Sequence, residues 1–234
     1  MLKNLGIAAL ALLLVSCGAP RPKPVAPPPP PPPAQSAPLP LPAGTTVYRI
    51  DPAQSELRVL VYRAGAMAKF GHNHVIANRM LAGQIDLAGS ATASSFLITI
   101  PVAGFVVDDE ELRRQEGADF AGEVPADAKQ GTLHNMLSPA LLDASEFAVI
   151  TVEGTNVTEH NGALTATLTV SVAGHESKFE APFTLEADAG RLSAAGTFEL
   201  RQSALGLAPF SVMLGALQVR DDMRLKFRIV AIAS

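Results

Sequence analysis

Apolar and polar side chains alternate strictly over long stretches in the second half of the chain. In residues 164–172 every second residue is Leu, Ala or Val, and the residues between them are Thr or Ser. The alternation resumes at 179–185, 192–200 and 223–229. A period of two is typical of β-strands with one buried face, because successive side chains point to opposite faces. These stretches therefore predict consecutive antiparallel strands.

The first part of the chain is expected to add shorter strands and a helical insertion. The strands are expected at 47–50, 56–63, 80–87, 95–102 and 147–153. The stretch 108–114 opens with four acidic residues, which favour a helix N-terminus because they complement the helix dipole. A second short helix is expected from Ala126 to Leu137. About eight antiparallel strands with a short helical insertion predict an all-β closed barrel, which leaves no sheet edge exposed.

The first residues have the layout of a secretory signal peptide. Lys3 provides the positive charge, and residues 5–15 form a short apolar run. This run is too short to cross a bilayer, which takes about 20 apolar residues. We therefore expect the segment 1–16 to direct export rather than to remain as a membrane anchor.

A cysteine follows the apolar run. Leu14-Val15-Ser16-Cys17-Gly18 resembles the lipobox of bacterial lipoproteins, in which the cysteine becomes the lipidated N-terminus. The resemblance implies that Cys17 carries acyl chains such as palmitate, which anchor the protein to a membrane. An ordinary signal peptide with a coincidental cysteine is the alternative, and lipidation is favoured because Cys17 is the only cysteine of the chain. Gly18 is not the aspartate associated with inner-membrane retention, which favours the periplasmic face of the outer membrane.

Residues 17–44 are expected to be a lipidated, proline-rich linker. Half of the residues from 19 to 44 are proline, and Arg21 and Lys23 are the only charged ones. Proline donates no backbone hydrogen bond, so a polyproline II helix is expected. At ~3.1 Å per residue, this semi-rigid spacer would reach on the order of 80 Å. A ligand for a proline-recognition module is the alternative, and no flanking pattern supports it.

Residues 45–234 are expected to form the one folded domain. All 22 Asp and Glu lie in it, whereas three of the 18 Lys and Arg precede it, so the domain is acidic. It shows no basic stripe and no cluster of aromatic residues, which argues against nucleic-acid binding. The sequence leaves the oligomeric state open, a dimer included.

Four short motifs in the domain resemble those of a known family. They are, in order, Tyr48-Arg49-Ile50-Asp51-Pro52 with Ser55, Ser138-Pro139-Ala140-Leu141-Leu142-Asp143 before a strand at Phe147, Leu168-Thr169-Val170 before Gly174, and Gln202-Ser203-Ala204-Leu205-Gly206. Their order and spacing are similar to those of the YceI-like, polyisoprenoid-binding family of periplasmic proteins, over nearly all of residues 46–232. The resemblance implies a lipocalin-like antiparallel β-barrel that holds a long isoprenoid or another apolar lipid chain.

The sizes of the side chains agree with a hollow barrel. The chain has no tryptophan, and many side chains expected to face inward are Ala, Gly, Val or Leu, which leave room. An eight-stranded barrel is wide enough either to be filled by side chains or to hold one small ligand, so a solid core is the alternative. A polar head group would stay near the barrel mouth. Arg201 and Gln202 are candidates to meet it, although both also fit a solvated strand end.

Two histidines depart from the family pattern. The segment Phe70-Gly71-His72-Asn73-His74 stands where family members have a glycine and an apolar residue. In an extended segment His72 and His74 project from the same face, which suits chelation of Zn²⁺ or Cu²⁺. His134 or His175 could add a third ligand. Alternatively, the pair forms hydrogen bonds across a loop at the barrel rim or contacts the head group of a ligand.

No hydrolytic active-site pattern accompanies these histidines. The sequence contains neither G-x-S-x-G nor H-E-x-x-H. It therefore predicts a non-enzymatic, lipid-anchored carrier of an apolar lipid in the periplasm. A metal-binding envelope protein is the second hypothesis, and a lipoprotein that only presents an interaction surface is the third.

Overall fold

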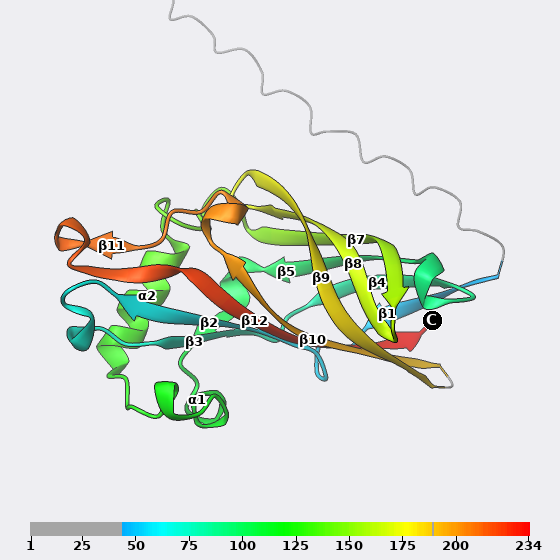
Figure 1. Cartoon of the computed structure of the whole chain (residues 1–234), viewed down its shortest axis with the longest axis horizontal. Helices are drawn as coiled ribbons and strands as arrows, with labels where there is room; N and C mark the ends of the chain where they lie inside the picture. Colours follow the sequence, from blue (N-terminus) through cyan, green and yellow to red (C-terminus); the bar gives the residue numbers. More distant parts are fainter. Residues whose placement is uncertain (1–43, 189) are drawn as a thin grey trace, which may run out of the picture. The chain divides into compact units, whose positions relative to one another are not determined.

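The strands of the domain close into a barrel, whose coordinates come from a computed structural model that describes residues 44–188 and 190–234 (Figure 1). Around the barrel the order is β1, β4, β5, β7, β8, β9, β10, β12, and the ring closes because β12 also pairs with β1. These strands are β1 (Thr45–Ile50), β4 (Ala82–Ala88), β5 (Ser94–Pro101), β7 (Val149–His160), β8 (Ala163–Val172), β9 (His175–Asp188), β10 (Arg191–Arg201) and β12 (Leu217–Ala233). The predicted closed antiparallel barrel is confirmed.

The predicted signal peptide, Cys17 and all of the linker except Gly44 lie outside the described residues. Within the part of the chain that the structure describes, no helix combines the length and the apolar character needed to cross a membrane.

The long strand β12 joins the ring to a three-stranded extension. One edge of β12 pairs with β10, and its other edge pairs first with β2 (Glu56–Ala64) and then with β1. Beyond β2 lie β3 (His74–Asn78) and β6 (Phe105–Val107). A further short strand, β11 (Ser211–Val212), pairs with the beginning of β12. The sheet therefore branches at β12, and β2, β3 and β6 continue the barrel wall beside it.

The two hairpins around β8 are tight because of their turn residues. Asn161 and Gly162 connect β7 to β8 with φ angles of 51° and 78°. Ala173 and Gly174 connect β8 to β9 with φ angles of 47° and 76°. Two successive left-handed residues form the turn whose twist matches that of paired strands. These turns hold the register that points the apolar residues of β8 into the barrel.

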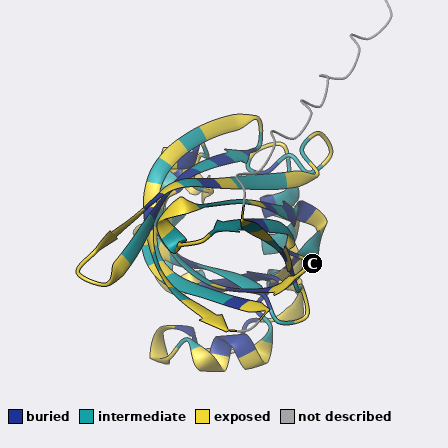
Figure 2. Ribbon diagram, turned by 90° about the vertical axis from the view of Figure 1, so that its right-hand side faces the viewer, coloured by how far each residue is buried: buried dark blue, intermediate teal, exposed yellow. Residues whose placement is uncertain are grey.

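Two helices lie between β6 and β7. The helix α2 (Ala126–Leu137) lies across the barrel end opposite to the one at which the chain terminates, and it contacts β6 (Figure 1). The helix α1 (Glu110–Gln115) lies outside the barrel wall against β3 (Figures 1 and 2). Short 3-10 turns complete the chain: η1 (Ala68–Phe70), η2 (Ala91–Ala93), η3 (Val102–Gly104), η4 (Ala118–Phe120), η5 (Ser203–Leu205) and η6 (Met213–Gly215).

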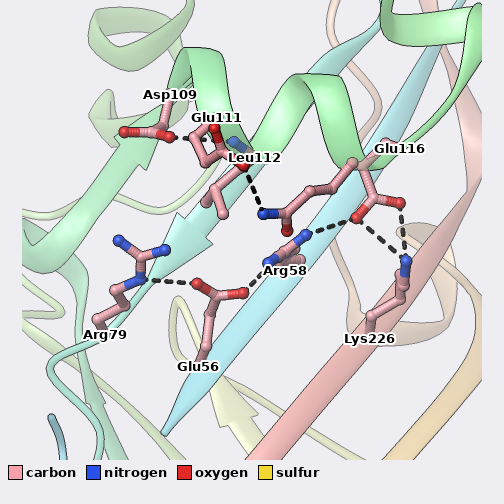
Figure 3. A network of polar contacts seen from close by, with 9 residues as sticks. Glu56, Arg58, Arg79, Asp109, Glu111, Leu112, Glu116 and Lys226 are labelled. Atoms are coloured by element: carbon pink, nitrogen blue, oxygen red, sulfur yellow. Dashed lines mark hydrogen bonds and ion pairs between the residues drawn. The ribbon is translucent and has the colours of Figure 1, made fainter. Parts of the chain in front are cut away.

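A network of ion pairs holds α1 against the barrel wall (Figure 3). Glu116, the C-cap residue of α1, accepts hydrogen bonds from Arg58 of β2 at 2.9 Å and from Lys226 of β12 at 2.8 Å. Glu56 pairs with Arg58 and with Arg79. Burial alone would raise the pKa of Glu116, but the hydrogen bonds from Lys226 and Arg58 outweigh burial and lower that pKa. Glu116 is therefore ionised and connects α1 to two strands.

The strands β2 and β3 bury side chains on both of their faces. On the inner face Val61 and Ile76 belong to the cluster that surrounds the barrel interior. On the outer face a second, smaller group, here called the outer cluster, consists of Leu60, Val75, Ala77, Leu112 and Phe120. All five residues of β3 are buried, so its sequence does not alternate, and the pattern at 74–78 predicts no strand.

The structure agrees with both predicted helix starts. The helix α2 has the predicted bounds, and α1 begins at Glu110, inside the acidic stretch that starts at residue 108. Asp109 is the N-cap, and its side chain accepts a hydrogen bond from the backbone N–H of Leu112 at 3.1 Å. Asp108 precedes the cap with a φ of 57°, and its side chain is buried in the barrel wall instead of at the helix end.

Candidate ligand-binding cavity

The barrel encloses a cavity of about 340 Å³. Figure 2 shows the ring of strands that surrounds it, seen from the end at which the chain terminates. Nearly all lining side chains are apolar, and the polar ones are His74, Ser94, Thr132, Asn135 and Gln202. Among the described lining residues there is no Asp, Glu, Lys or Arg. The volume lies in the range of small-molecule sites, about 300–1,000 Å³.

The residues that the alternation places on one face line this cavity. They are Ala166, Leu168, Val170 and Val172 of β8, Phe179, Ala181, Phe183 and Leu185 of β9, Leu192, Ala194, Phe198 and Leu200 of β10, and Met223, Leu225, Phe227 and Ile229 of β12. Leu164, the first of the series, packs against the same core without lining the cavity. The interior is therefore hollow, and the solid-core alternative does not describe it.

Glycines make room for two of the phenylalanine rings. Phe96 lies directly opposite Gly154 in the β5–β7 pair, and Phe227 lies opposite Gly196 in the β10–β12 pair. A Cβ atom on Gly154 would come within 2.0 Å of Cζ of Phe96, and one on Gly196 would come within 2.6 Å of the ring of Phe227. Each ring therefore lies over the backbone of the neighbouring strand and leaves the middle of the barrel open.

His74 is the one ionisable side chain among the described lining residues. It begins β3 with its side chain on the same face as Ile76, toward the cavity. Its Nδ1 lies 2.6 Å from Oδ2 of Asp108, and its Nε2 lies 3.3 Å from the hydroxyl oxygen of Thr132 on α2. The imidazole is thus held between a carboxylate in the barrel wall and the helix that lies across the barrel end.

Asp108 is the buried centre of this network. Its Oδ1 accepts hydrogen bonds from the backbone N–H of Val75 at 2.9 Å and from Nη1 of Arg113 at 2.5 Å. Arg113 also donates to the backbone oxygens of Asn73 and Gly122. Burial would raise the pKa of Asp108, but the hydrogen bonds from His74, Val75 and Arg113 outweigh burial and lower that pKa. Asp108 is therefore ionised inside the wall, where Arg113 pairs with it.

The other histidines named by the sequence lie apart from this network. His134 is exposed on α2, and His175 is exposed at the start of β9 beside Gly206. The ring of His72 is 6.1 Å from that of His74, and burial lowers the pKa of His72. In residues 44–188 and 190–234 no three His, Cys, Asp or Glu side chains form a group that could hold a metal ion. The Zn²⁺ or Cu²⁺ site stays a prediction, and no described residue supplies a third ligand beside His72 and His74.

The two candidates for a head-group contact point in different directions. Gln202 is buried, lines the cavity, and donates from Nε2 to the backbone oxygen of Arg220 at 2.8 Å. Arg201 is exposed and does not line the cavity. Of the pair, Gln202 is therefore the one placed to meet a ligand inside the barrel.

Four residues of the cavity and its polar network had no predicted role there. Asp108 and Arg113 stand in a stretch whose charges suit an exposed helix, and their burial depends on the pairing of β3 with β6. Thr132 and Asn135 lie on α2. The spacing of Thr132 and Asn135 could have indicated their position, because both lie on the helix face of the buried Met136. That spacing marks the face of α2 that lies on the cavity.

Comparison with known proteins agrees with this fold. The YceI-like domain model matches residues 48–231. The crystal structure of Burkholderia cenocepacia BcnA has a TM-score of 0.57 and 15% sequence identity, over 77% of this chain and 98% of that one. A polyisoprenoid-binding domain from Saccharophagus degradans, implicated in plant cell wall breakdown, has a TM-score of 0.53 and 11% identity, over 81% and 99% of the two chains. None of the curated proteins compared with the sequence matches it.

Proposed function

The chain belongs to the YceI-like domain family, and from this premise we propose that it is a non-enzymatic carrier whose barrel holds one isoprenoid or other long apolar lipid. The observation that carries the proposal is the uncharged, almost wholly apolar cavity of about 340 Å³. The Saccharophagus degradans neighbour, described as a polyisoprenoid-binding domain, supports the choice of ligand class.

The energetics favour a chain-like ligand. Each CH₂ group that leaves water for an apolar site contributes about 0.8 kcal/mol, so a long chain binds tightly without ion pairs. A charged group buried in such a lining would lose its hydration and gain no counter-ion. An eight-stranded barrel also admits only one slender ligand beside its own side chains. These terms together select long, narrow and uncharged molecules.

The proposed setting is the periplasmic face of the outer membrane. The support is sequence alone: the export signal at 1–16, the lipobox that ends at Cys17, and the proline-rich linker at 17–44. An acyl anchor and a stiff spacer would hold the barrel near the membrane from which an apolar ligand comes. A Cys17→Ser variant expressed in the native host should lose incorporation of an alkyne-labelled fatty acid and leave the membrane fraction. Retention of the label would contradict the lipidation.

Ligand content provides the main test. Full-length protein purified from its native host is extracted with organic solvent, and the extract is analysed by mass spectrometry. We expect about one apolar lipid per chain. The Ala194→Phe variant narrows the cavity and should lower the recovered lipid, whereas Ala195→Phe, on the opposite face of β10, should not. Absence of any apolar ligand in wild-type extracts would contradict the proposal.

A further inference from the structure

The α2 end of the cavity differs from the rest of its lining. His74, Thr132 and Asn135, here called the polar end, bring polar atoms to the cavity where α2 lies across the barrel. Thr132 and Asn135 are three residues apart on α2 and therefore lie on the same face. The side chain of Asn135 makes no hydrogen bond to any described residue, although it lines the cavity.

The hydrogen bonds behind His74 determine what its exposed nitrogen offers. Nδ1 faces a carboxylate, which accepts only, so the proton lies on Nδ1. Asp108 already pairs with Arg113, so its charge is compensated without a second cation. In the neutral imidazole that carries its proton on Nδ1, Nε2 is an acceptor. A neutral His74 therefore offers a hydrogen-bond acceptor to a ligand in the cavity.

The present partner of Nε2 is easily replaced. The Thr132 hydroxyl lies 3.3 Å from Nε2, beyond the usual range of about 2.7–3.2 Å for hydrogen bonds that involve nitrogen. A helical threonine can instead rotate its hydroxyl toward a backbone carbonyl of the preceding turn. A ligand hydroxyl can thus take the place of Thr132 without leaving a buried polar group unpaired.

We propose, on the basis of the carrier function above, that the polar end binds an uncharged hydroxyl group at the end of the apolar chain. The hydroxyl donates to Nε2 of His74, and the Asn135 side-chain amide donates to the hydroxyl oxygen. The chain then extends along the barrel toward Ser94 at the start of β5. Phosphate and carboxylate head groups are disfavoured, because the described lining has no Lys or Arg to compensate their charge.

Three probes with one isoprenoid chain test this inference on delipidated full-length protein. They are farnesol, the hydrocarbon in which a methyl group replaces the hydroxyl, and farnesyl phosphate. Dissociation constants are measured for the wild type and for His74→Leu. We expect the affinity ratio of farnesol to the hydrocarbon to fall about tenfold in His74→Leu, since a net hydrogen bond of about 1.4 kcal/mol corresponds to that factor. Farnesyl phosphate should bind more weakly than farnesol.

Two further variants keep the test decisive if His74→Leu folds poorly. Asn135→Leu should lower the same ratio about threefold, whereas His134→Leu, on the exposed side of α2, should leave it unchanged. An equal ratio in wild type, His74→Leu and Asn135→Leu would overturn the hydroxyl site while the carrier function stands. Tighter binding of farnesyl phosphate would overturn it too. Failure of all three probes to bind would instead contradict the carrier function.

Discussion

The strands β2 and β3 separate two apolar regions that are built differently. On the outer face, Tyr62 and Phe120 lie with ring centroids 5.6 Å apart, and Leu60 and Val75 are almost fully buried in the outer cluster. On the inner face, Val61 and Ile76 face the cavity. Side chains from α1 reach the outer face, whereas the opposite wall of the barrel is too distant for the side chains to fill the interior. The outer cluster therefore stabilises the fold, whereas the interior leaves room for a ligand.

The largest expected effect lies between the two regions, at Asp108. The Asp108→Asn variant would remove the anion that pairs with the buried Arg113, and loss of one partner of a buried ion pair costs about 4 kcal/mol. Urea unfolding measures this loss. The neighbouring Asp109→Asn should change stability little, because asparagine also caps helices well. Similar losses in the two variants would mean that the buried network does not link the two regions.

The next largest effect is expected in the outer cluster. Phe120→Ala removes a ring that is 2% exposed and should destabilise the protein by about 3 kcal/mol, from lost burial and the cavity left behind. Its affinity for a lipid probe should be unchanged at temperatures where the variant stays folded. Thermal unfolding and a binding titration check the two halves of this prediction. A loss of affinity equal to the loss of stability would remove the distinction between the regions.

The same kind of truncation inside the barrel should behave differently. Leu168→Ala enlarges space that is already open, so we expect a cost of about 2 kcal/mol, at the lower end for such changes. Affinity for bulkier apolar chains should rise. Unfolding experiments and titrations with chains of increasing width test both points. A cost as large as that of Phe120→Ala, with no gain in affinity, would show that the interior is packed as tightly as the outer cluster.

The smallest effect concerns pH and the contact of α1 with the wall. Folding lowers the pKa of Glu116 from its ordinary value of 4.5, so its contribution to stability is complete above pH 4.5 and is lost as the pH falls through the folded-state pKa. Glu116→Gln should therefore be less stable than wild type at neutral pH, and the difference should shrink in acid. Denaturant midpoints measured from pH 7 to pH 3 provide the test. A difference that does not change with pH would contradict it.

Much of the barrel is predictable from sequence because its longer strands have one buried face. The alternation in β8 places Ala166, Leu168 and Val170 on the cavity side, where the structure has them. The strand β3 shows no such alternation and is not predicted, because both of its faces are buried. The strand β6 has three residues, too few to establish a period.

The polar end is only half predictable. The spacing of His74 from His72 marks the pair in the sequence, and contact with a ligand head group is one of the alternatives that this spacing leaves open. The hydrogen-bond partner of His74, Asp108, is 34 residues away. Asp108 stands in an acidic stretch that is typical of a helix N-terminus. The pairing of β3 with β6, followed by the left-handed backbone at Asp108, brings the two together. Such a contact depends on strand register, which no local pattern in the sequence reveals.

The two phenylalanine–glycine pairs across neighbouring strands have a consequence for how this cavity can change by mutation. Gly154→Ala alone would collide with Phe96, and Phe96→Leu alone would leave a gap above Gly154, so each change is costly until the other is present. The same holds for Gly196 and Phe227. Substitutions at these sites are thus expected to be non-additive, and the width of the barrel at both points is a property of strand pairs rather than of single residues.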